Sequence, residues 1–480
     1  MDKQHETSDE SRPLADVHDL TLVKDIYAKA EDWAGKEVKI GGTVRTIRAQ
    51  KALAFISLSD GSCFTPLQIV VEAATYPNFE EISQLGTGTT LICRGTLVAT
   101  PTLAQPIELH ATEILVEGAS PSTYPLQAKR HSREYLRTIA HLRPRANLFQ
   151  AVFRLRSEVA FAIHRYFHDR NFVYVHTPIL TTTDAEGAGE MFHVTNFDLA
   201  HVPKTEDGGV DYSKDFFGRA THLTVTGQLE GESFAQAFRD IYTFGPTFRA
   251  EDSNTPRHAA EFWMIEPEMA FCELDGCMEV AEGMVKAIFD AALDHLPAEM
   301  DFFDQFVEKG LLERLQKIRE ADFARMTYTD AIEVLKKAHR SFQYPVEWGI
   351  DLQTEHERYL SEVYAKRPIF ITDYPKDFKA FYMKQNPDGK TVRAVDLLVP
   401  GVGEIIGGSQ REEDYDKLAR RIEELKMPMD HYTWYLDLRK YGTMRHAGYG
   451  LGFERMIMYL SGVNNIRDVL PYPRTTGQIF

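Results

Sequence analysis

The stretch from residue 221 to 271 constrains the fold more than any other, because it predicts two strands with charge on one face only. Two runs within it alternate apolar and polar side chains. The polar positions include Arg249 and Glu251 in the first run, and Glu266 and Glu268 in the second. Side chains alternate between the faces of a strand, so each strand should bury one face and present charge on the other. The short connection predicts an antiparallel pair with these four charges side by side.

An ordinary half-solvated pair of strands would show the same alternation. Phe262 favours a binding surface instead, because it is an aromatic residue on the polar face of the second run. Arg257 and His258 come shortly before it. The stretch therefore predicts a surface that holds a flat ring and a polyanion.

The formal net charge of −17 argues against a protein that binds nucleic acid with its whole surface. A local basic groove is compatible with it, since residues 36–51 contain five basic residues and one acid. The sequence has no apolar run of membrane-spanning length and no apolar core of a secretion signal, which indicates a cytoplasmic protein. Its four cysteines lack zinc-type spacing.

Short β-type runs punctuated by Gly or Pro fill residues 14–118 and predict a small five-stranded barrel. Its basic and aromatic residues are typical of an OB fold that binds single-stranded nucleic acid, with Phe55 as a stacking platform. A generic barrel with Phe55 in its core would explain the same pattern. The polar residues 1–13 are expected to be disordered.

Residues 119–145 are basic and punctuated by Pro, and we expect them to form a hinge. In residues 146–480, helical spacing alternates with strands in antiparallel-type succession, with a helical insertion at about 275–365. The predicted fold is therefore α+β, an N-terminal OB-fold β-barrel followed by an antiparallel sheet flanked by helices.

Near the C-terminus, Gly448, Gly450 and Gly452 precede a predicted helix with Arg455 in its first turn. Glycines admit close backbone approach and the arginine supplies a cation, which suits a triphosphate. A purely structural turn would explain the glycines equally well.

Asp396 and Glu404 flank a Pro-Gly turn, and carboxylates on adjacent strands suit Mg²⁺ bridging phosphates. Two acids on a solvated hairpin are at least as common when considered alone. Together with the arginines and Phe262, however, these acids predict a site for ATP and an amino acid on an antiparallel sheet.

Three segments resemble the signature motifs of the class II aminoacyl-tRNA synthetases. The helix and strand ending at Pro178 are similar to motif 1, which forms the dimer, residues 248–262 to motif 2, and residues 448–455 to motif 3. A barrel ahead of the catalytic domain matches the aspartate, asparagine and lysine subgroup. Runs such as TVTGQLEGES and GEIIGGSQREE are similar to its asparagine branch of the bacterial type. The resemblance covers nearly the whole chain from about Val23.

The resemblance implies a homodimeric enzyme that uses ATP, Mg²⁺, L-asparagine and tRNA(Asn). It implies catalytic roles for Arg249, Glu251 and Arg455. These three residues would also bind ATP, together with Arg257, His258, Phe262 and Glu404. In this scheme Arg249 would hold the α-phosphate, Phe262 would stack on adenine, and His258 would lie near the γ-phosphate. Mg²⁺ would be held by Asp396 and Glu404, and the amino acid would be bound by Gln228, Glu232, Glu266 and Arg411.

One position bears on whether the amino-acid substrate is asparagine or aspartate. The aspartate enzymes of the subgroup carry a Lys three residues after the glutamine that matches Gln228, and this chain has Gly231 there, followed by Glu232. A site that lacks this lysine and has the carboxylate of Glu232 nearby should repel a substrate carboxylate. It should accept hydrogen bonds from the amide of asparagine. The resemblance therefore favours asparagine.

In the barrel, Arg45, Phe55 and Gln68 match the positions with which the subgroup reads the anticodon. Phe55 would stack the central uridine and Gln68 would bond its edge, as is usual for single-stranded loops. Two other functions remain open. One is an aspartyl-tRNA synthetase, or a relative that makes asparagine through aspartyl-adenylate; the other is a catalytically inactive paralogue that serves as a nucleic-acid-binding module.

Overall fold

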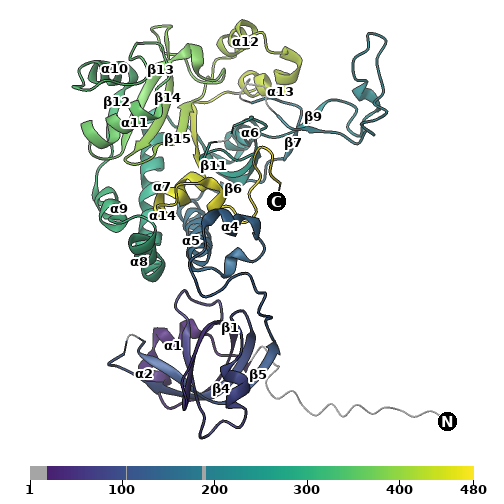
Figure 1. Ribbon diagram of the computed structural model, residues 1–480. Coiled ribbons are helices and arrows are strands. Elements are labelled where there is room, and N and C mark those ends of the chain that lie inside the picture. Colours follow the sequence, from purple (N-terminus) through teal and green to yellow (C-terminus); the bar gives the residue numbers. More distant parts are fainter. Residues whose placement is uncertain (1–18, 104, 186–190, 254, 480) are drawn as a thin grey trace, which may run out of the picture. The chain divides into compact units, whose positions relative to one another are not determined.

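The structure is a computed structural model that describes residues 19–103, 105–185, 191–253 and 255–479. The chain divides into two compact units, Met1–Gln150 and Ala151–Phe480 (Figure 1). The segment expected to be disordered, residues 1–13, lies outside the described residues. Among the helices of the described ranges, none has the length and apolar character needed to cross a membrane.

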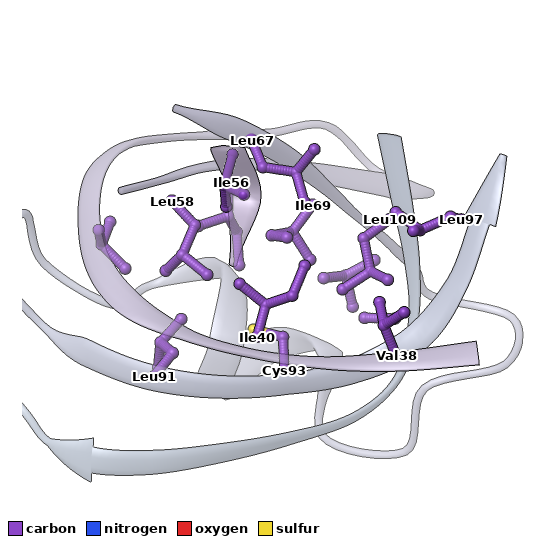
Figure 2. Close-up of a cluster of buried hydrophobic side chains, with 14 of the residues drawn as sticks. Val38, Ile40, Ile56, Leu58, Leu67, Ile69, Leu91, Cys93, Leu97 and Leu109 are labelled. Atoms are coloured by element: carbon purple, nitrogen blue, oxygen red, sulfur yellow. The ribbon is translucent and has the colours of Figure 1, made fainter. Parts of the chain in front are cut away.

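The first unit contains a closed five-stranded barrel in the order β1-β2-β3-β5-β4. Its strands are β1 (Glu37–Ala49), β2 (Leu53–Ser59), β3 (Leu67–Glu72), β4 (Thr90–Ala99) and β5 (Ile107–Gly118), accompanied by the short helices α1 (Val23–Ala28), α2 (Ala30–Trp33) and α3 (Phe79–Ser83). Figure 2 shows the aliphatic side chains that fill the barrel. Along β2, Ala54, Ile56 and Leu58 are buried in this core, whereas Phe55 lies on the other face, half-buried. The predicted barrel is confirmed, and the alternative with Phe55 in its core is wrong.

The expected hinge, residues 119–145, contains α4 (Arg133–Thr138) and the 3-10 turn η2 (Arg143–Arg145). Ser132 caps α4, because its hydroxyl accepts a hydrogen bond from the backbone of Tyr135 at 3.1 Å. The segment is therefore partly helical, and the first compact unit extends beyond it to Gln150.

The second unit is built on an eight-stranded sheet in the order β12-β13-β14-β15-β16-β11-β10-β6. The strands are β6 (Val173–Tyr174), β10 (Asp240–Phe248), β11 (Glu261–Ala270), β12 (Ala324–Thr327), β13 (Ile369–Pro375), β14 (Thr391–Val399), β15 (Gly403–Gln410) and β16 (His446–Gly452). All neighbours are antiparallel except the outermost pairs, β12 with β13 and β10 with β6. A small second sheet joins β7 (Leu180–Thr181), β9 (Thr221–Leu223) and β8 (His193–Val194). The predicted α+β architecture is confirmed.

The expected register of the strand pair β10 and β11 is wrong. β10 ends at Phe248, opposite Glu261, so Arg249 and Glu251 lie in the connection beyond the strand and not beside Glu266 and Glu268. Glu266 faces Thr243 instead. The antiparallel pairing of β10 and β11 is as predicted, but the chain leaves the ladder earlier than the alternation suggests.

Helices cover the sheet (Figure 1). They are α5 (Asn147–His168), α6 (Gln228–Phe238), α7 (Leu274–His295), α8 (Pro297–Phe306), α9 (Leu311–Glu320), α10 (Tyr328–Lys336), α11 (Thr354–Arg358), α12 (Tyr415–Glu424), α13 (Met429–Lys440) and α14 (Phe453–Ser461). α6 packs on β10 and β11, and α7 packs on β14, β15 and β16. The expected helical insertion differs in one respect: it also contains β12, which extends the main sheet and whose four residues are too few for a periodic signal.

Candidate active site

One cavity of the second unit is lined from three adjacent strands, β11, β16 and β15, and from the connections around them. Eleven of the twelve site residues expected in this unit line it: Gln228, Arg249, Glu251, Arg257, His258, Phe262, Glu266, Asp396, Glu404, Arg411 and Arg455. These residues span more than two hundred positions of the sequence, so only the folded sheet brings them together. The exception is Glu232.

Aromatic and cationic side chains lie close together in this cavity. The guanidinium carbon of Arg249 lies 5.4 Å from the centre of the Phe262 ring, within cation–π range. Burial lowers the pKa of His258, and nearby Arg455, Arg249 and Arg257 lower it further against the opposing effect of Glu251. The imidazole therefore lies in the field of three cations, and this part of the cavity is suited to a polyanion.

Carboxylates gather in another part of the cavity. Burial, followed by repulsion from Asp396, raises the pKa of Glu404 to about 7. Burial and repulsion from Glu404 raise the pKa of Glu357 to about 8. A Cβ atom on Gly407 would lie 3.1 Å from Oε1 of Glu404 and 3.5 Å from Oδ1 of Asp396, so both carboxylates reach the same point above this glycine. A cation stabilises a cluster of carboxylates like this one, and the ammonium group of Lys379 already donates a hydrogen bond to Asp396 at 2.8 Å.

Glu266, on β11, is buried and is held by donors from the residues just before α6 and from β10. It accepts hydrogen bonds from the hydroxyl of Thr226, from the backbone of Gly227 at 3.0 Å and from the hydroxyl of Thr243 at 2.9 Å. Gln228 begins the helix beside it. Both side chains line the cavity, so a fixed carboxylate and an amide lie together there.

Arg411 enters the cavity with its charge already paired. Its guanidinium donates to both oxygens of Glu268 and, at 2.7 Å, to the hydroxyl of Ser409. Burial raises the pKa of Glu268 to about 7, and the ion pair with Arg411 opposes that rise. Gly231 lies beside the side chain of Glu268, since a Cβ there would lie 3.9 Å from Cγ of Glu268. Glu268 is thus a functional residue beyond those expected, and its only signal in the sequence is its place on the polar face of its strand.

Glu232 does not line the cavity, which differs from its expected role as a direct ligand of the amino acid. Its fully buried carboxylate accepts hydrogen bonds from Tyr435, Arg439 and His446 at 2.7–2.8 Å. It also accepts one from Gln228 at 3.1 Å. Its position on α6 turns it toward α13 and β16, where these cationic and polar groups compensate a buried charge.

The three expected anticodon residues divide into two groups within the barrel. Phe55 and Gln68 lie on the outer face of neighbouring strands, and Gln68 donates to Glu108 at 2.9 Å. Arg45 is bound to the carbonyl of Arg145 and to the side chain of Asn147. Exposed Arg48, one of the five basic residues in segment 36–51, lies directly opposite Phe55 in the strand register.

Two family models match the chain. Residues 38–117 match the OB-fold nucleic acid binding domain, and residues 132–476 match the tRNA synthetases class II (D, K and N). The asparagine–tRNA ligase of Acetivibrio thermocellus is 62% identical over 95% of this chain and 98% of that protein. The asparagine–tRNA ligase of Clostridium novyi is 60% identical over 96% of this chain and 99% of that protein.

Among solved structures, the asparaginyl-tRNA synthetase of Pyrococcus horikoshii complexed with asparaginyl-adenylate superimposes with a TM-score of 0.82. It is 31% identical and covers 96% of this chain and 99% of its own. The sequence relationship, the fold and the barrel all agree with the resemblance found in the sequence. The chain belongs to the class II tRNA synthetases of the D, K and N group, in the asparagine–tRNA ligase family.

Proposed function

We propose that this protein activates L-asparagine with ATP to asparaginyl-adenylate and pyrophosphate, and then transfers asparagine to the 3′ end of tRNA(Asn). The observation that carries the choice of amino acid is the pairing of Arg411 with Glu268 in the cavity wall. Two arginines, Arg411 and Arg439, face two carboxylates, Glu232 and Glu268, so their formal charges cancel. A neutral amide preserves that balance.

Aspartate would add an anion next to Glu268 without a cation to meet it. An uncompensated charge in a buried site is expensive, so such a site discriminates strongly against aspartate. The lack of a side chain at Gly231 preserves this charge balance, because a lysine at this position would neutralise Glu268. In our proposal Arg411 donates to the amide oxygen, and Glu232 acts indirectly by holding Gln228.

In the first step an oxygen of the asparagine carboxylate forms a bond to the α-phosphorus of ATP. The bond from that phosphorus to the bridging oxygen breaks, and pyrophosphate leaves with the electron pair. No proton has to move, so catalysis consists of positioning and of neutralising charge at phosphorus. Arg249 would neutralise charge on the α-phosphate with Glu251 beside it, and Arg455, Arg257 and His258 would hold the other phosphates.

In the second step a ribose hydroxyl at the 3′ end of the tRNA attacks the carbonyl carbon of the adenylate. The bond to the phosphate oxygen breaks, AMP leaves, and the hydroxyl proton passes to a phosphate oxygen of AMP. Gln228 and Glu266 would hold the α-ammonium group of asparagine through both steps, which keeps the carbonyl in one position.

The carboxylates of Asp396 and Glu404 fit Mg²⁺, because hard oxygen ligands converge above Gly407 and their mutual repulsion would be relieved by a cation. No three His, Cys, Asp or Glu side chains in the described ranges form a fuller metal cage. Mg²⁺ commonly binds through one or two carboxylates and substrate phosphates, so two protein ligands suffice. When bound, the ion would neutralise phosphate charge.

We propose a homodimer formed through α5 and β6, the region that ends at Pro178. β6 is an edge strand of the eight-stranded sheet, and Val173 and Tyr174 on it are exposed. Phe161 on α5 is 67% exposed. An open edge beside exposed apolar side chains is suited to a second copy. Sedimentation should show a dimer that Phe161→Glu weakens; an unchanged dimer would place the interface elsewhere.

We also propose that the barrel reads the anticodon of tRNA(Asn) through Phe55, Gln68 and Arg45, and that the enzyme acts in the cytoplasm. None of its four cysteines, all within the described ranges, forms a disulfide, which agrees with a reducing compartment. The stacking face of Phe55 and the amide of Gln68 are the groups that unpaired bases require.

ATP–pyrophosphate exchange on the purified protein tests the proposal, with asparagine and aspartate measured in parallel and no tRNA added. We expect exchange with asparagine alone. Exchange with aspartate would overturn the charge-balance argument and leave the phosphate chemistry intact. The absence of exchange with either amino acid would favour an inactive paralogue. Charging of tRNA(Asn) then tests the second step.

A further inference from the structure

We propose that Arg156, on α5, is a positioning residue of the nucleotide site, which acts through Glu454 on the ring of Phe262. This inference rests on the proposed function, because it adds a residue to the same ATP site. Glu454 lines the cavity, whereas Arg156 contacts Glu454 from α5 and does not line it.

A buried ion pair joins α5 to the start of α14. Nη2 of Arg156 lies 2.7 Å from Oε1 of Glu454, and the two side chains are 15% and 2% exposed. The guanidinium carbon lies 4.6 Å from the centre of the Phe453 ring, within cation–π range. Nη1 donates to the carbonyl of Val469 at 3.4 Å. Arg156 is thus held by three contacts, and it compensates a carboxylate that is buried in the cavity wall.

Glu454 passes this constraint on to β11. Its other oxygen, Oε2, accepts a hydrogen bond from the backbone N–H of Trp263 at 2.9 Å. The carbonyl of Phe262 belongs to the same peptide unit and accepts from the hydroxyl of Thr247 at 3.3 Å. The pairing of β11 with β16 begins at Met264, so at Trp263 the carboxylate takes the place of a strand partner. Because a peptide unit is planar, these two hydrogen bonds fix the direction in which the ring of Phe262 leaves the strand.

The direction of this ring matters for the nucleotide, because Phe262 is expected to stack on adenine. A stacking contact stabilises a bound base only when the ring lies against it, so a ring that is fixed in advance binds ATP more tightly. Arg455 follows Glu454 directly, in the first turn of α14. The same ion pair therefore anchors the helix start that carries a second group expected to hold ATP.

Arg156→Met tests the inference, because it removes the charge and keeps a long side chain that can pack on Phe453. We expect KM for ATP in pyrophosphate exchange to rise about tenfold. KM for asparagine should not change, since Arg411 and Glu268 in its part of the cavity form an ion pair of their own. An unchanged KM for ATP, or an equal rise in both KM values, would overturn the inference.

Arg154→Met is the matched control for a general loss of stability. Arg154 lies two residues earlier on α5, and its Nε lies 3.9 Å from Oε1 of Glu299, another buried carboxylate. Neither of these two residues lines the cavity. We expect Arg154→Met to lower the temperature of thermal unfolding and to leave both KM values unchanged. If it raises KM for ATP as Arg156→Met does, destabilisation explains both variants and Arg156 has no positioning role.

A double variant separates folding from positioning, and it can be assayed even where Arg156→Met is too unstable. Arg156→Met/Glu454→Gln leaves no uncompensated charge, so thermal unfolding should return toward that of the unchanged protein. KM for ATP should stay raised, because the glutamine is no longer anchored from α5. Recovery of KM together with stability would overturn the inference.

Removal of the ring identifies the group on which Arg156 acts. Phe262→Leu should raise KM for ATP by itself, and adding Arg156→Met should cause little further rise, because no ring is left to position. Independent effects that multiply would place the action of Arg156 elsewhere and overturn the inference. If the unchanged protein gives no exchange with ATP and asparagine, the proposed function itself fails.

Discussion

Nη2 of Arg439 lies 2.7 Å from Oε2 of Glu232, and both side chains are completely buried. The two residues belong to α13 and α6, which are far apart in the sequence, so this ion pair ties together two helices near the cavity. Tyr435 and His446 donate to the same carboxylate. Glu232 is thus a structural anion, and Gln228 in the cavity wall is oriented by it.

Glu232→Gln should therefore destabilise the protein strongly. Removing one partner of a buried pair leaves Arg439 uncompensated, and the free energy of unfolding should fall by about 3–5 kcal/mol at neutral pH. Chemical denaturation measures the change. The double variant Glu232→Gln/Arg439→Gln should lose less than the sum of the single variants. Additive losses would contradict the pairing.

The same residue makes stability depend on pH. Burial alone would raise the pKa of Glu232, but Arg439, His446 and Arg411 together hold it below its ordinary value. A lowered pKa in the folded state gives stability that is present above about pH 4.5 and is lost as the pH falls below it. Glu232→Gln should remove this part of the acid dependence, as thermal unfolding at several pH values would show.

Arg249→Ala should abolish adenylate formation without unfolding the protein. Arg249 lines the cavity beyond the end of β10, and the mechanism that we propose has it neutralise charge on the phosphate under attack. We expect pyrophosphate exchange to fall by a factor of about 10²–10³, the usual effect of removing a group that stabilises developing charge. Arg249→Lys should restore little of the exchange activity, because an ammonium group cannot reproduce the planar arrangement of hydrogen-bond donors of a guanidinium. Substantial exchange by Arg249→Ala would remove the residue from its assigned role.

The local sequence could predict the strands β10 and β11, the helix that starts before Arg455, and the barrel, because each has a period or a turn signal of its own. It could not predict the surroundings of Glu232. Three partners of that carboxylate, Tyr435, Arg439 and His446, are 203–214 residues away in the sequence, and no local pattern marks them. The register of Arg249 and Glu251 could not be predicted for a related reason, since the alternation of side chains continues past the last residue pair of the two strands, Phe248 and Glu261.

Phe55→Ala should separate the two steps of the reaction. Phe55 is half-buried on the outer face of the barrel and contributes nothing to its core, so the variant should fold. Adenylate formation should be unchanged, while the efficiency of tRNA charging should fall by about tenfold or more, the effect of losing one stacked base. Arg48→Ala tests the neighbouring cation, and its effect should shrink as salt rises. Unchanged charging by Phe55→Ala would remove Phe55 from the anticodon site.

Gly231→Lys should shift the choice of amino acid. A Cβ at this position meets only ordinary contacts, the nearest being Cδ1 of Ile241 at 3.4 Å. Because Cγ of Glu268 lies 3.9 Å from that Cβ, we expect the new ammonium group to pair with this carboxylate and to release Arg411 to bind an anion. We expect exchange with asparagine to fall and the ratio of aspartate to asparagine exchange to rise at least about tenfold. Gly231→Met has similar length without charge and should lower exchange without changing the ratio. If both variants change the ratio alike, bulk and not charge determines the selection, and the electrostatic account of asparagine specificity would have to be abandoned.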